Sequence, residues 1–156
     1  MRGRCKKKNG KSAKKSQLEQ GLGRSCGGFS TKIHAVCDAL GNPLRFIVTA
    51  GQVHDSTQAI ELIKGLHASA VLADKGYDAQ DIVQAIELSG ATAIIPSRSN
   101  AIQPRWIDME LYKERHKIEC SFGFLKHYRR LFSRFDKLKS RFTAFLHFAA
   151  ALQWLK

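Results

Sequence analysis

The chain has 156 residues, of which 44% are hydrophobic, and a formal net charge of +13. This length is enough for one domain with its own apolar core. No apolar run approaches the roughly 20 residues of a membrane span, and no Gly-x-x-x-x-Gly-Lys-Ser/Thr phosphate loop occurs. Neither a membrane nor a nucleotide is therefore implied as a partner.

The positive charge lies at the two ends of the sequence. Residues 1–24 hold nine Lys or Arg and one acid, residues 25–100 hold five and seven, and residues 101–156 hold twelve and five. Basic ends around a slightly acidic centre are typical of a protein that binds a polyanion, and favour nucleic acid over generic solubility charge. The four cysteines have no regular spacing, so they are interpreted as reduced thiols of a cytoplasmic protein.

The first predicted elements are a basic segment and a hairpin. Residues 1–24 lack periodicity and are either a flexible arm that binds a polyanion or a disordered leader without function. Residues 30–38 and 44–50 alternate and carry β-branched side chains, which predicts two strands around a Gly-Asn-Pro turn. We expect these strands to pair as an antiparallel hairpin.

A helix is predicted from Asp55 to about Lys64, with Gly65 as its stop. Gln58 follows Asp55 by three residues, which is the spacing of a capping box. His54 and Asp55 could form a catalytic pair. The capping pattern already accounts for Asp55, however, so the sequence favours a helix cap beside a surface histidine.

Asp74 follows a short apolar run at residues 70–73, of the kind that forms buried parallel strands. Open α/β sheets bind ligands at the carboxyl ends of such strands. Asp74 could also be a turn or cap residue, but Asp78 is the better cap for the helix predicted at 79–88, which leaves Asp74 for chemistry. A further strand is predicted at 92–95.

The C-terminal third is predicted to be mainly helical. Residues 97–108 are loop-like, and Arg98 and Arg105 in this loop could reach a backbone phosphate. One helix is predicted from Met109 to Phe132, and an amphipathic helix from 140 to 155. The aromatic side chains of the last helix suit a core or an oligomer contact.

The central helix carries the most informative side chains. At about 100° per residue, Tyr112, Arg115, Glu119 and Lys126 fall within a face roughly 60° wide, beside an apolar stripe. A carboxylate among cations and a phenol suits a metal ligand in phosphoryl transfer. The same spacing is also that of an ordinary i,i+4 ion pair on a solvated helix.

From residue 21 to residue 154 the chain resembles the C-terminal catalytic part of bacterial insertion-sequence DDE transposases of the insertion-sequence-five group. The spacing of Tyr112, Arg115, Glu119 and Lys126 matches the pattern around the last acid of that family. The other matching segments are Gly-Arg-Ser-Cys-Gly-Gly-Phe-Ser-Thr-Lys-Ile-His at 23–34, Asp-Ala-Leu-Gly-Asn-Pro-Leu at 38–44, Gly-Gln-Val-His-Asp-Ser at 51–56 and Ala-Asp-Lys-Gly-Tyr-Asp at 73–78.

The resemblance implies an α/β, ribonuclease-H-like mixed sheet flanked by helices over residues 25–156, and metal-dependent phosphodiester cleavage and strand transfer on transposon ends and target DNA. Asp74 and Glu119 match the second and third metal-binding acids, which hold Mg²⁺ or Mn²⁺ in the family. Tyr112, Arg115, Lys126 and Arg98 are then expected to contact DNA. The expected location is the cytoplasm of a bacterium, at its nucleoid.

The family's first acid, in an Asp-Ser-Thr context on the first strand, has no counterpart in residues 1–156, because neither Asp38 at a turn nor Asp55 at a helix start replaces it. The sequence therefore predicts a downstream transposase part that lacks the first strand and has little cleavage activity alone. It would work as a homo-oligomer or with an upstream transposase half. The alternatives are a catalytically dead DNA-binding fragment that inhibits the full enzyme, and a host-repair nuclease.

Overall fold

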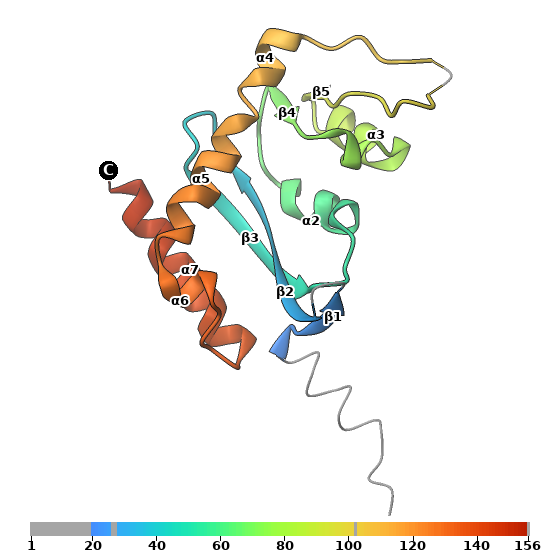
Figure 1. Ribbon diagram of the computed structural model, residues 1–156. Coiled ribbons are helices and arrows are strands. Elements are labelled where there is room, and N and C mark those ends of the chain that lie inside the picture. Colours follow the sequence, from blue (N-terminus) through green and yellow to red (C-terminus); the bar gives the residue numbers. More distant parts are fainter. Residues whose placement is uncertain (1–19, 26–27, 102, 156) are drawn as a thin grey trace, which may run out of the picture.

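A long antiparallel hairpin lies at the centre of the structure, a computed structural model that describes residues 20–25, 28–101 and 103–155 (Figure 1). Strand β2 (Gly28–Cys37) pairs with β3 (Pro43–Ala50) in a register that runs from Thr31 opposite Ala50 to Cys37 opposite Pro43. The short β1 (Gly23–Ser25) pairs with the first residues of β2, also antiparallel. Both predicted strands and their hairpin are confirmed.

The turn between β2 and β3 is held by Asp38. Its Oδ1 accepts hydrogen bonds from the backbone N–H groups of Leu40 and Asn42, at 2.9 and 2.8 Å. Burial alone would raise the pKa of the Asp38 carboxyl, but these bonds favour its charged form and the net pKa is lowered. Gly41 takes φ 91°, the left-handed conformation that a glycine adopts without steric cost.

A second layer follows the hairpin along the chain. It contains the 3₁₀ turn η1 (Asp55–Gln58), α2 (Ala59–Ile63), β4 (Ala70–Leu72), a second 3₁₀ turn η2 (Lys75–Tyr77), α3 (Gln80–Leu88) and β5 (Thr92–Ile94). β4 and β5 are parallel, as predicted, although β4 is only partly buried, and their layer has its own core. Residues of that core include Ala59, Ile82, Ile86 and Ile95.

The strands of the described residues form two small sheets rather than the single mixed sheet that the sequence predicted. One has the order β1-β2-β3 and the other β4-β5. The α/β class is confirmed, whereas no ladder of the described chain joins β2 to β4. The ribonuclease-H-like arrangement stays a prediction.

The helix predicted over residues 109–132 is wrong as a single element. The chain forms α4 (Met109–Lys113), α5 (His116–Lys126) and α6 (Arg129–Phe132), followed by α7 (Lys139–Trp154). Between α4 and α5 the backbone bonds tighten to i,i+3, from Glu114 N to Leu111 O at 3.1 Å and from Arg115 N to Tyr112 O at 3.1 Å. Such 3₁₀ bonds change the helix phase, so α5 starts a new helix.

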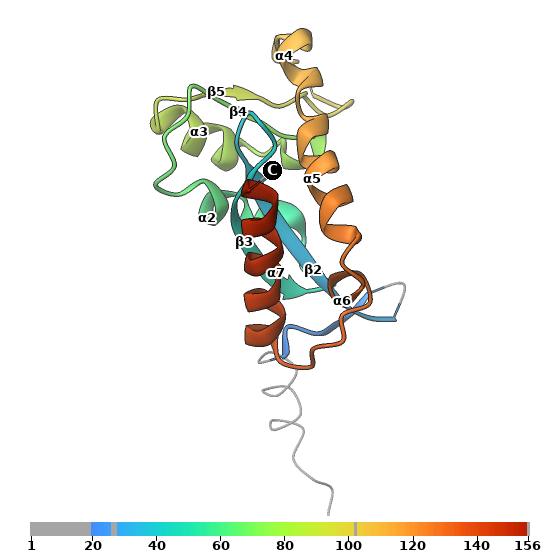
Figure 2. The same ribbon diagram turned by 90° about the vertical axis from the view of Figure 1, so that its left-hand side faces the viewer.

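The hairpin lies between two helical layers. Helices α5, α6 and α7 lie along one side of β2 and β3, and α2 lies on the other, as the two views show (Figures 1 and 2). On the first side Phe46 and Val48 of β3 pack against the buried side chains of Leu125, Phe142 and Leu146. Burial of this apolar surface fixes α5 against the sheet.

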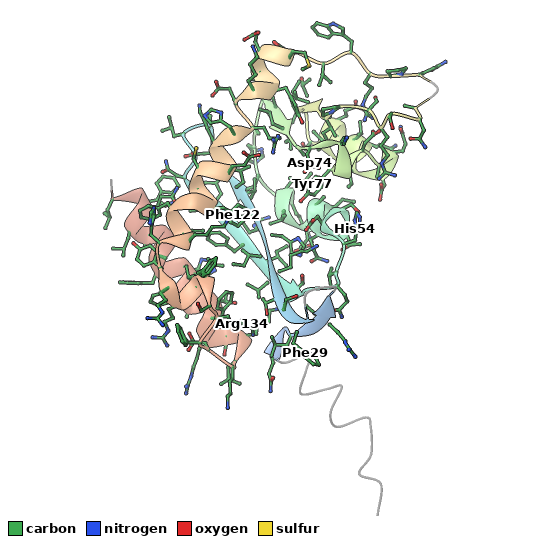
Figure 3. All side chains as sticks on the ribbon, viewed as in Figure 1. Phe29, His54, Asp74, Tyr77, Phe122 and Arg134 are labelled. Atoms are coloured by element: carbon green, nitrogen blue, oxygen red, sulfur yellow. The ribbon has the colours of Figure 1, made fainter. Side chains whose placement is uncertain are left out.

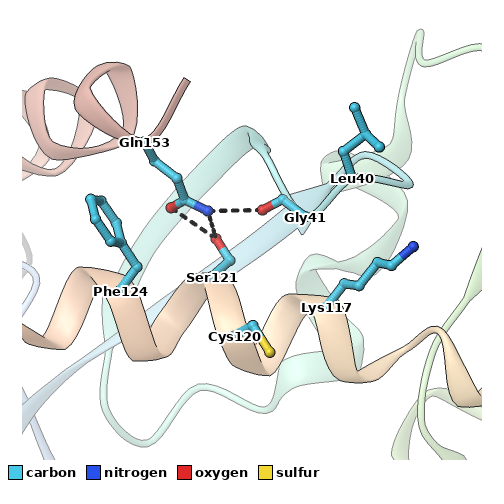
Figure 4. Close-up of a pocket in the computed structure, with 7 residues that line it drawn as sticks. All are labelled: Leu40, Gly41, Lys117, Cys120, Ser121, Phe124 and Gln153. Carbon is cyan, nitrogen blue, oxygen red and sulfur yellow. Dashed lines mark hydrogen bonds between the residues drawn. The ribbon is translucent and has the colours of Figure 1, made fainter. Parts of the chain in front are cut away.

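A polar contact holds the C-terminal end of α7 against α5 and the hairpin turn. The Gln153 Nε2 donates to the carbonyl of Gly41 at 3.0 Å and lies 3.1 Å from the hydroxyl of Ser121, in a small pocket of about 230 Å³ (Figure 4). Because Ser121 is buried, these bonds satisfy a group that would otherwise be costly to desolvate. They fix the rotation of α5, which carries Glu119.

The helix cap predicted at Asp78 is wrong. Asp78 does not cap α3: its carboxylate accepts from the backbone N–H of Arg98 at 2.7 Å and pairs with the guanidinium of Arg105.

Residues 1–19 of the predicted basic arm lie outside the described residues, whereas Gly23 and Arg24 of that segment belong to β1. Within the described chain, no helix has the length and apolarity needed to cross a membrane.

Candidate functional site

Three of the four motif residues meet at the junction of α4 and α5. An Nη2 atom of Arg115 lies 2.8 Å from Oε1 of Glu119, one helical turn away. The guanidinium carbon of Arg115 also lies over the Tyr112 ring, 5.8 Å from its centroid. Burial would lower the pKa of Arg115, but the hydrogen bond and charge of Glu119 raise it. The arginine is thus held as a permanent cation between an acid and a phenol.

The Glu119 carboxylate remains accessible although it is paired. Its side chain is 62% exposed, against 30% for Arg115. The observed pair is the i,i+4 contact that the sequence left open beside the catalytic interpretation. An exposed carboxylate with one oxygen bound to a cation can still offer its second oxygen to a ligand, so the geometry is compatible with both interpretations.

Lys126 and Arg98 lie apart from this cluster. Lys126 is exposed at the last residue of α5, seven residues beyond Glu119, about 10 Å along the helix axis. Arg98 lies in the loop after β5, where its backbone N–H binds Asp78. The structure therefore groups Tyr112, Arg115 and Glu119, and leaves the two other predicted DNA contacts at separate positions.

Asp74 lies two residues beyond the end of β4, near the strand end as predicted, and caps the turn η2. Its Oδ1 accepts a hydrogen bond from the backbone N–H of Gly76 at 2.7 Å. A Cβ at Gly76 would lie only 2.8 Å from the same oxygen, so the glycine is needed for this carboxylate orientation. Asp74 is exposed. The cap uses one carboxylate oxygen, Oδ1, and the second oxygen lies outside this contact.

A network that the sequence did not reveal lies beside Asp74. Tyr77 of η2 is partly buried, and burial together with the charges of Asp55 and Asp74 raises its pKa to about 12. In the view of Figure 3, Asp74, Tyr77 and His54 lie on one side of the molecule and Phe122 lies on the other. The phenol thus stays protonated between two carboxylates.

Asp55 belongs to this network and is not the helix cap that the sequence predicted. The residue before η1 is His54, and no side chain caps that turn. The Asp55 carboxylate lies 3.4 Å from Nζ of Lys32 and 3.1 Å from Nδ1 of His34 on β2. These contacts with residues of the hairpin, which are distant in sequence, replace the expected local cap. His54, in turn, is exposed and contacts Ser56.

His34 is the buried member of the network. The residue is 3% exposed, and its Nε2 lies 2.7 Å from the hydroxyl of Thr49 on the paired strand. Its Nδ1 is close to Asp55 but poorly aligned for a hydrogen bond, and has no other partner. Burial lowers the pKa of His34, although Asp55 partly opposes this effect. The sequence signal for this network was a pair of polar side chains, Lys32 and His34, at alternating positions of one strand.

The two predicted metal ligands lie on different elements at one end of the molecule. Asp74 follows β4, Glu119 is in the first turn of α5, and both views place β4 and the start of α5 at the same end (Figures 1 and 2). No hydrogen bond or ion pair joins the two acids in the described chain. Among the same residues, no group of three or more His, Cys, Asp or Glu side chains gathers as a metal site.

The comparisons with known proteins agree on one family. The family model described as "Transposase DDE domain" matches residues 4–154. The chain is 42% identical over 133 residues to "Putative transposase for insertion sequence element IS6501" of Brucella ovis, covering 82% of this chain and all of that protein. It is 32% identical over 139 residues to "Putative transposase for insertion sequence element IS402" of Burkholderia cepacia, covering 78% of this chain and 61% of that protein. No solved structure matches. The chain therefore belongs to the DDE-domain transposase family.

Proposed function

We propose that the chain is a catalytic part of a DDE transposase, in which Asp74 and Glu119 bind a divalent metal for phosphodiester cleavage and strand transfer at the ends of an insertion sequence. The observation that carries the proposal is the family match over residues 4–154, which includes both acids. Their location at one end of the fold, after β4 and in the first turn of α5, supports it.

The two carboxylates suit Mg²⁺ by their chemistry. Mg²⁺ prefers hard oxygen ligands, keeps several waters, and is commonly bound through one or two carboxylates together with substrate phosphates. Asp74 and Glu119 are both exposed, and each has one oxygen outside its intramolecular contact. A bound divalent cation would activate the attacking oxygen and stabilise the charge that develops at the scissile phosphate.

The chain's own side chains would orient the DNA. Arg115 can bind a phosphate oxygen while it holds Glu119, because a guanidinium has five donors and the observed ion pair uses one nitrogen. Tyr112 supports Arg115 from its ring face. Lys126, at the far end of α5, would contact a second phosphate, and Arg98 a third. A ribonuclease-H-like sheet, with a first acid supplied from outside these residues, belongs to the same proposal.

Binding of Mn²⁺ by the purified chain, measured by electron paramagnetic resonance with and without transposon-end DNA, tests this proposal. Asp74→Asn and Glu119→Gln should each weaken Mn²⁺ binding at least tenfold in the presence of DNA. Asp81→Asn and Glu110→Gln are matched controls, since both acids are exposed on helices outside the proposed site. They should leave the Mn²⁺ affinity unchanged.

Cleavage provides the second measurement. In a transposase reconstituted with its first acid, Asp74→Asn and Glu119→Gln should abolish nicking in Mg²⁺ while DNA affinity stays nearly intact, because a metal ligand is needed for chemistry and not for positioning. If Glu119→Gln cleaves at the wild-type rate, Glu119 serves only as the ion-pair partner of Arg115. DNA binding without any metal effect would favour a non-catalytic DNA-binding role.

A further inference from the structure

A strongly basic segment connects the end of α5 to the start of α7. Residues 126–141 contain seven Lys or Arg and one acid, Asp136, and so hold more than half of the twelve Lys and Arg that follow residue 100. In both views α6 and the loop that leads into α7 lie at the end of the molecule opposite to α4 (Figures 1 and 2). Figure 3 shows Arg134 at this end and Asp74 toward the other. This charge is therefore separate from the proposed metal ligands.

The single acid of the segment is already neutralised. Both oxygens of the Asp136 carboxylate accept hydrogen bonds from Arg130, one from Nε and one from Nη2, each at 2.8 Å. These bonds lower the pKa of Asp136, and the charges of Arg141 and Arg134 add to this effect. The Asp136 side chain is only 8% exposed. Because a two-bond guanidinium–carboxylate pair is the strong form of this contact, Asp136 is committed to Arg130.

Arg134 holds the loop before α7 in one conformation. Its backbone φ is 41°, a left-handed value that residues other than glycine rarely adopt. Its guanidinium donates to the carbonyls of Gly21 and Asp136, at 3.1 and 3.3 Å, and also to that of Gln20. It lies over the Phe142 ring, 5.1 Å from the centroid. These contacts offset the cost of the unusual backbone, so the loop presents its other side chains from a fixed position.

Three exposed cations beyond α5 have no anionic partner in the part of the chain that the structure describes. They are Arg129, Lys137 and Arg141, and we call them the basic corner. The guanidinium of Arg129 lies over the ring of Phe135, 5.8 Å from its centroid, and that phenylalanine is 61% exposed. Stacking on a ring restrains a guanidinium while its N–H donors stay available at the edge.

The start of α7 adds to the positive field. This helix has no acid in its first turn and no side-chain cap at Leu138, whereas Lys139 and Arg141 lie in that turn. Cations are disfavoured at a helix N-terminus, where the helix dipole is positive. The stability of α7 therefore does not explain these two residues, and a bound anion would relieve their repulsion.

The chain itself does not supply that anion. Residues 1–19, which precede the carbonyls bound by Arg134, carry eight Lys or Arg and one acid, so their charge cannot neutralise the corner. Under the proposed function, DNA already lies along α5. Lys126 is the last residue of that helix, about 10 Å along its axis from Glu119, and Arg129 follows three residues later. A duplex that passes Lys126 would continue onto the basic corner.

We propose that the basic corner binds the phosphate backbone of duplex DNA, beyond the contacts assigned to Tyr112, Arg115 and Lys126, and without reading its sequence. The choice of DNA as the polyanion rests on the proposed function. Phosphate contacts fix the position and direction of a duplex but carry no sequence information. The corner would thus hold the duplex along α5, at the end of the fold away from the metal ligands.

Binding of a fluorescein-labelled duplex of about 20 base pairs and random sequence, measured by anisotropy over a series of salt concentrations, tests the proposal. Arg129→Ala, Lys137→Ala and Arg141→Ala should each lower the slope of log affinity against log salt by about one, and the triple variant by about three. Lys64→Ala makes the same change of net charge as each single variant, at an exposed residue after α2, and should leave the slope unchanged. All these variants should keep the wild-type melting temperature, because they alter exposed side chains. Slopes equal to that of Lys64→Ala in all three corner variants would overturn the proposal.

Two further measurements identify the partner and separate this proposal from that of the metal site. The triple variant should lose more affinity for the duplex than for poly-L-glutamate at the same concentration of charge. An equal or larger loss for poly-L-glutamate would assign the corner to an acidic polypeptide and overturn the choice of DNA. The Mn²⁺ affinity of the DNA-free chain should be the same in the triple variant and in wild type. If instead the Asp74 and Glu119 variants bind Mn²⁺ normally while the corner variants lower the salt slope, the metal site is wrong and the corner stands.

Discussion

The substitution Thr49→Val tests the buried network around His34. Valine keeps the shape of threonine but removes the hydroxyl that lies 2.7 Å from Nε2 of His34. The histidine side chain is fully buried and its Nδ1 already lacks a well-aligned partner. The substitution would therefore leave the imidazole without a hydrogen bond at either nitrogen.

The expected cost follows from this burial. An unsatisfied buried polar group costs about 1–3 kcal/mol, so we expect the free energy of unfolding to fall by about 2 kcal/mol. A loss of that size lowers the melting temperature by roughly 4–8 °C in a chain of this length. Urea denaturation and thermal melting followed by circular dichroism at pH 7.5 measure both quantities.

Thr92→Val is the matched control, because Thr92 is exposed on β5 and the same atoms are exchanged there. It should change the free energy of unfolding by less than about 0.5 kcal/mol. If Thr49→Val and Thr92→Val are equally neutral, the hydroxyl of Thr49 does not satisfy the buried imidazole. The contact of Thr49 with His34 would then not contribute to stability.

Three further predictions concern pH, metal and DNA. Because the pKa of His34 is lower in the folded chain, the unfolded chain binds a proton at a higher pH, so the free energy of unfolding falls as pH decreases through 6.5. Urea denaturation at pH 7.5 and 5.5 should show a smaller loss of this free energy for His34→Gln than for wild type. Gly76→Ala should displace the Asp74 carboxylate and weaken Mn²⁺ binding, with little change in melting temperature; an unchanged Mn²⁺ affinity would contradict the importance of its orientation. Lys126→Ala should reduce DNA affinity for all sequences and lower the slope of log affinity against log salt by about one. The exposed Lys64→Ala should not alter that slope, and an equal effect of both would mean that only net charge matters.

Much of the secondary structure and one part of the site could be predicted from the sequence, because both depend on residues close to one another in the chain. The alternation of residues at 30–38 and 44–50 is a property of β2 and β3 themselves, and short apolar runs predicted β4 and β5. The contact of Arg115 with Glu119 spans four residues, so helical geometry alone brings them together. The location of Asp74 after a strand was likewise a local pattern.

Tertiary structure decided the features whose partners are distant in sequence. Asp55 fits a capping pattern, yet its carboxylate lies beside Lys32 and the buried His34, because the hairpin brings these two side chains close to it. Asp78 binds Arg105, 27 residues away, instead of capping α3. A carboxylate at a helix end can accept a hydrogen bond from a nearby backbone N–H or pair with a cationic side chain that the fold brings close. The bond to a cationic partner is the stronger of the two.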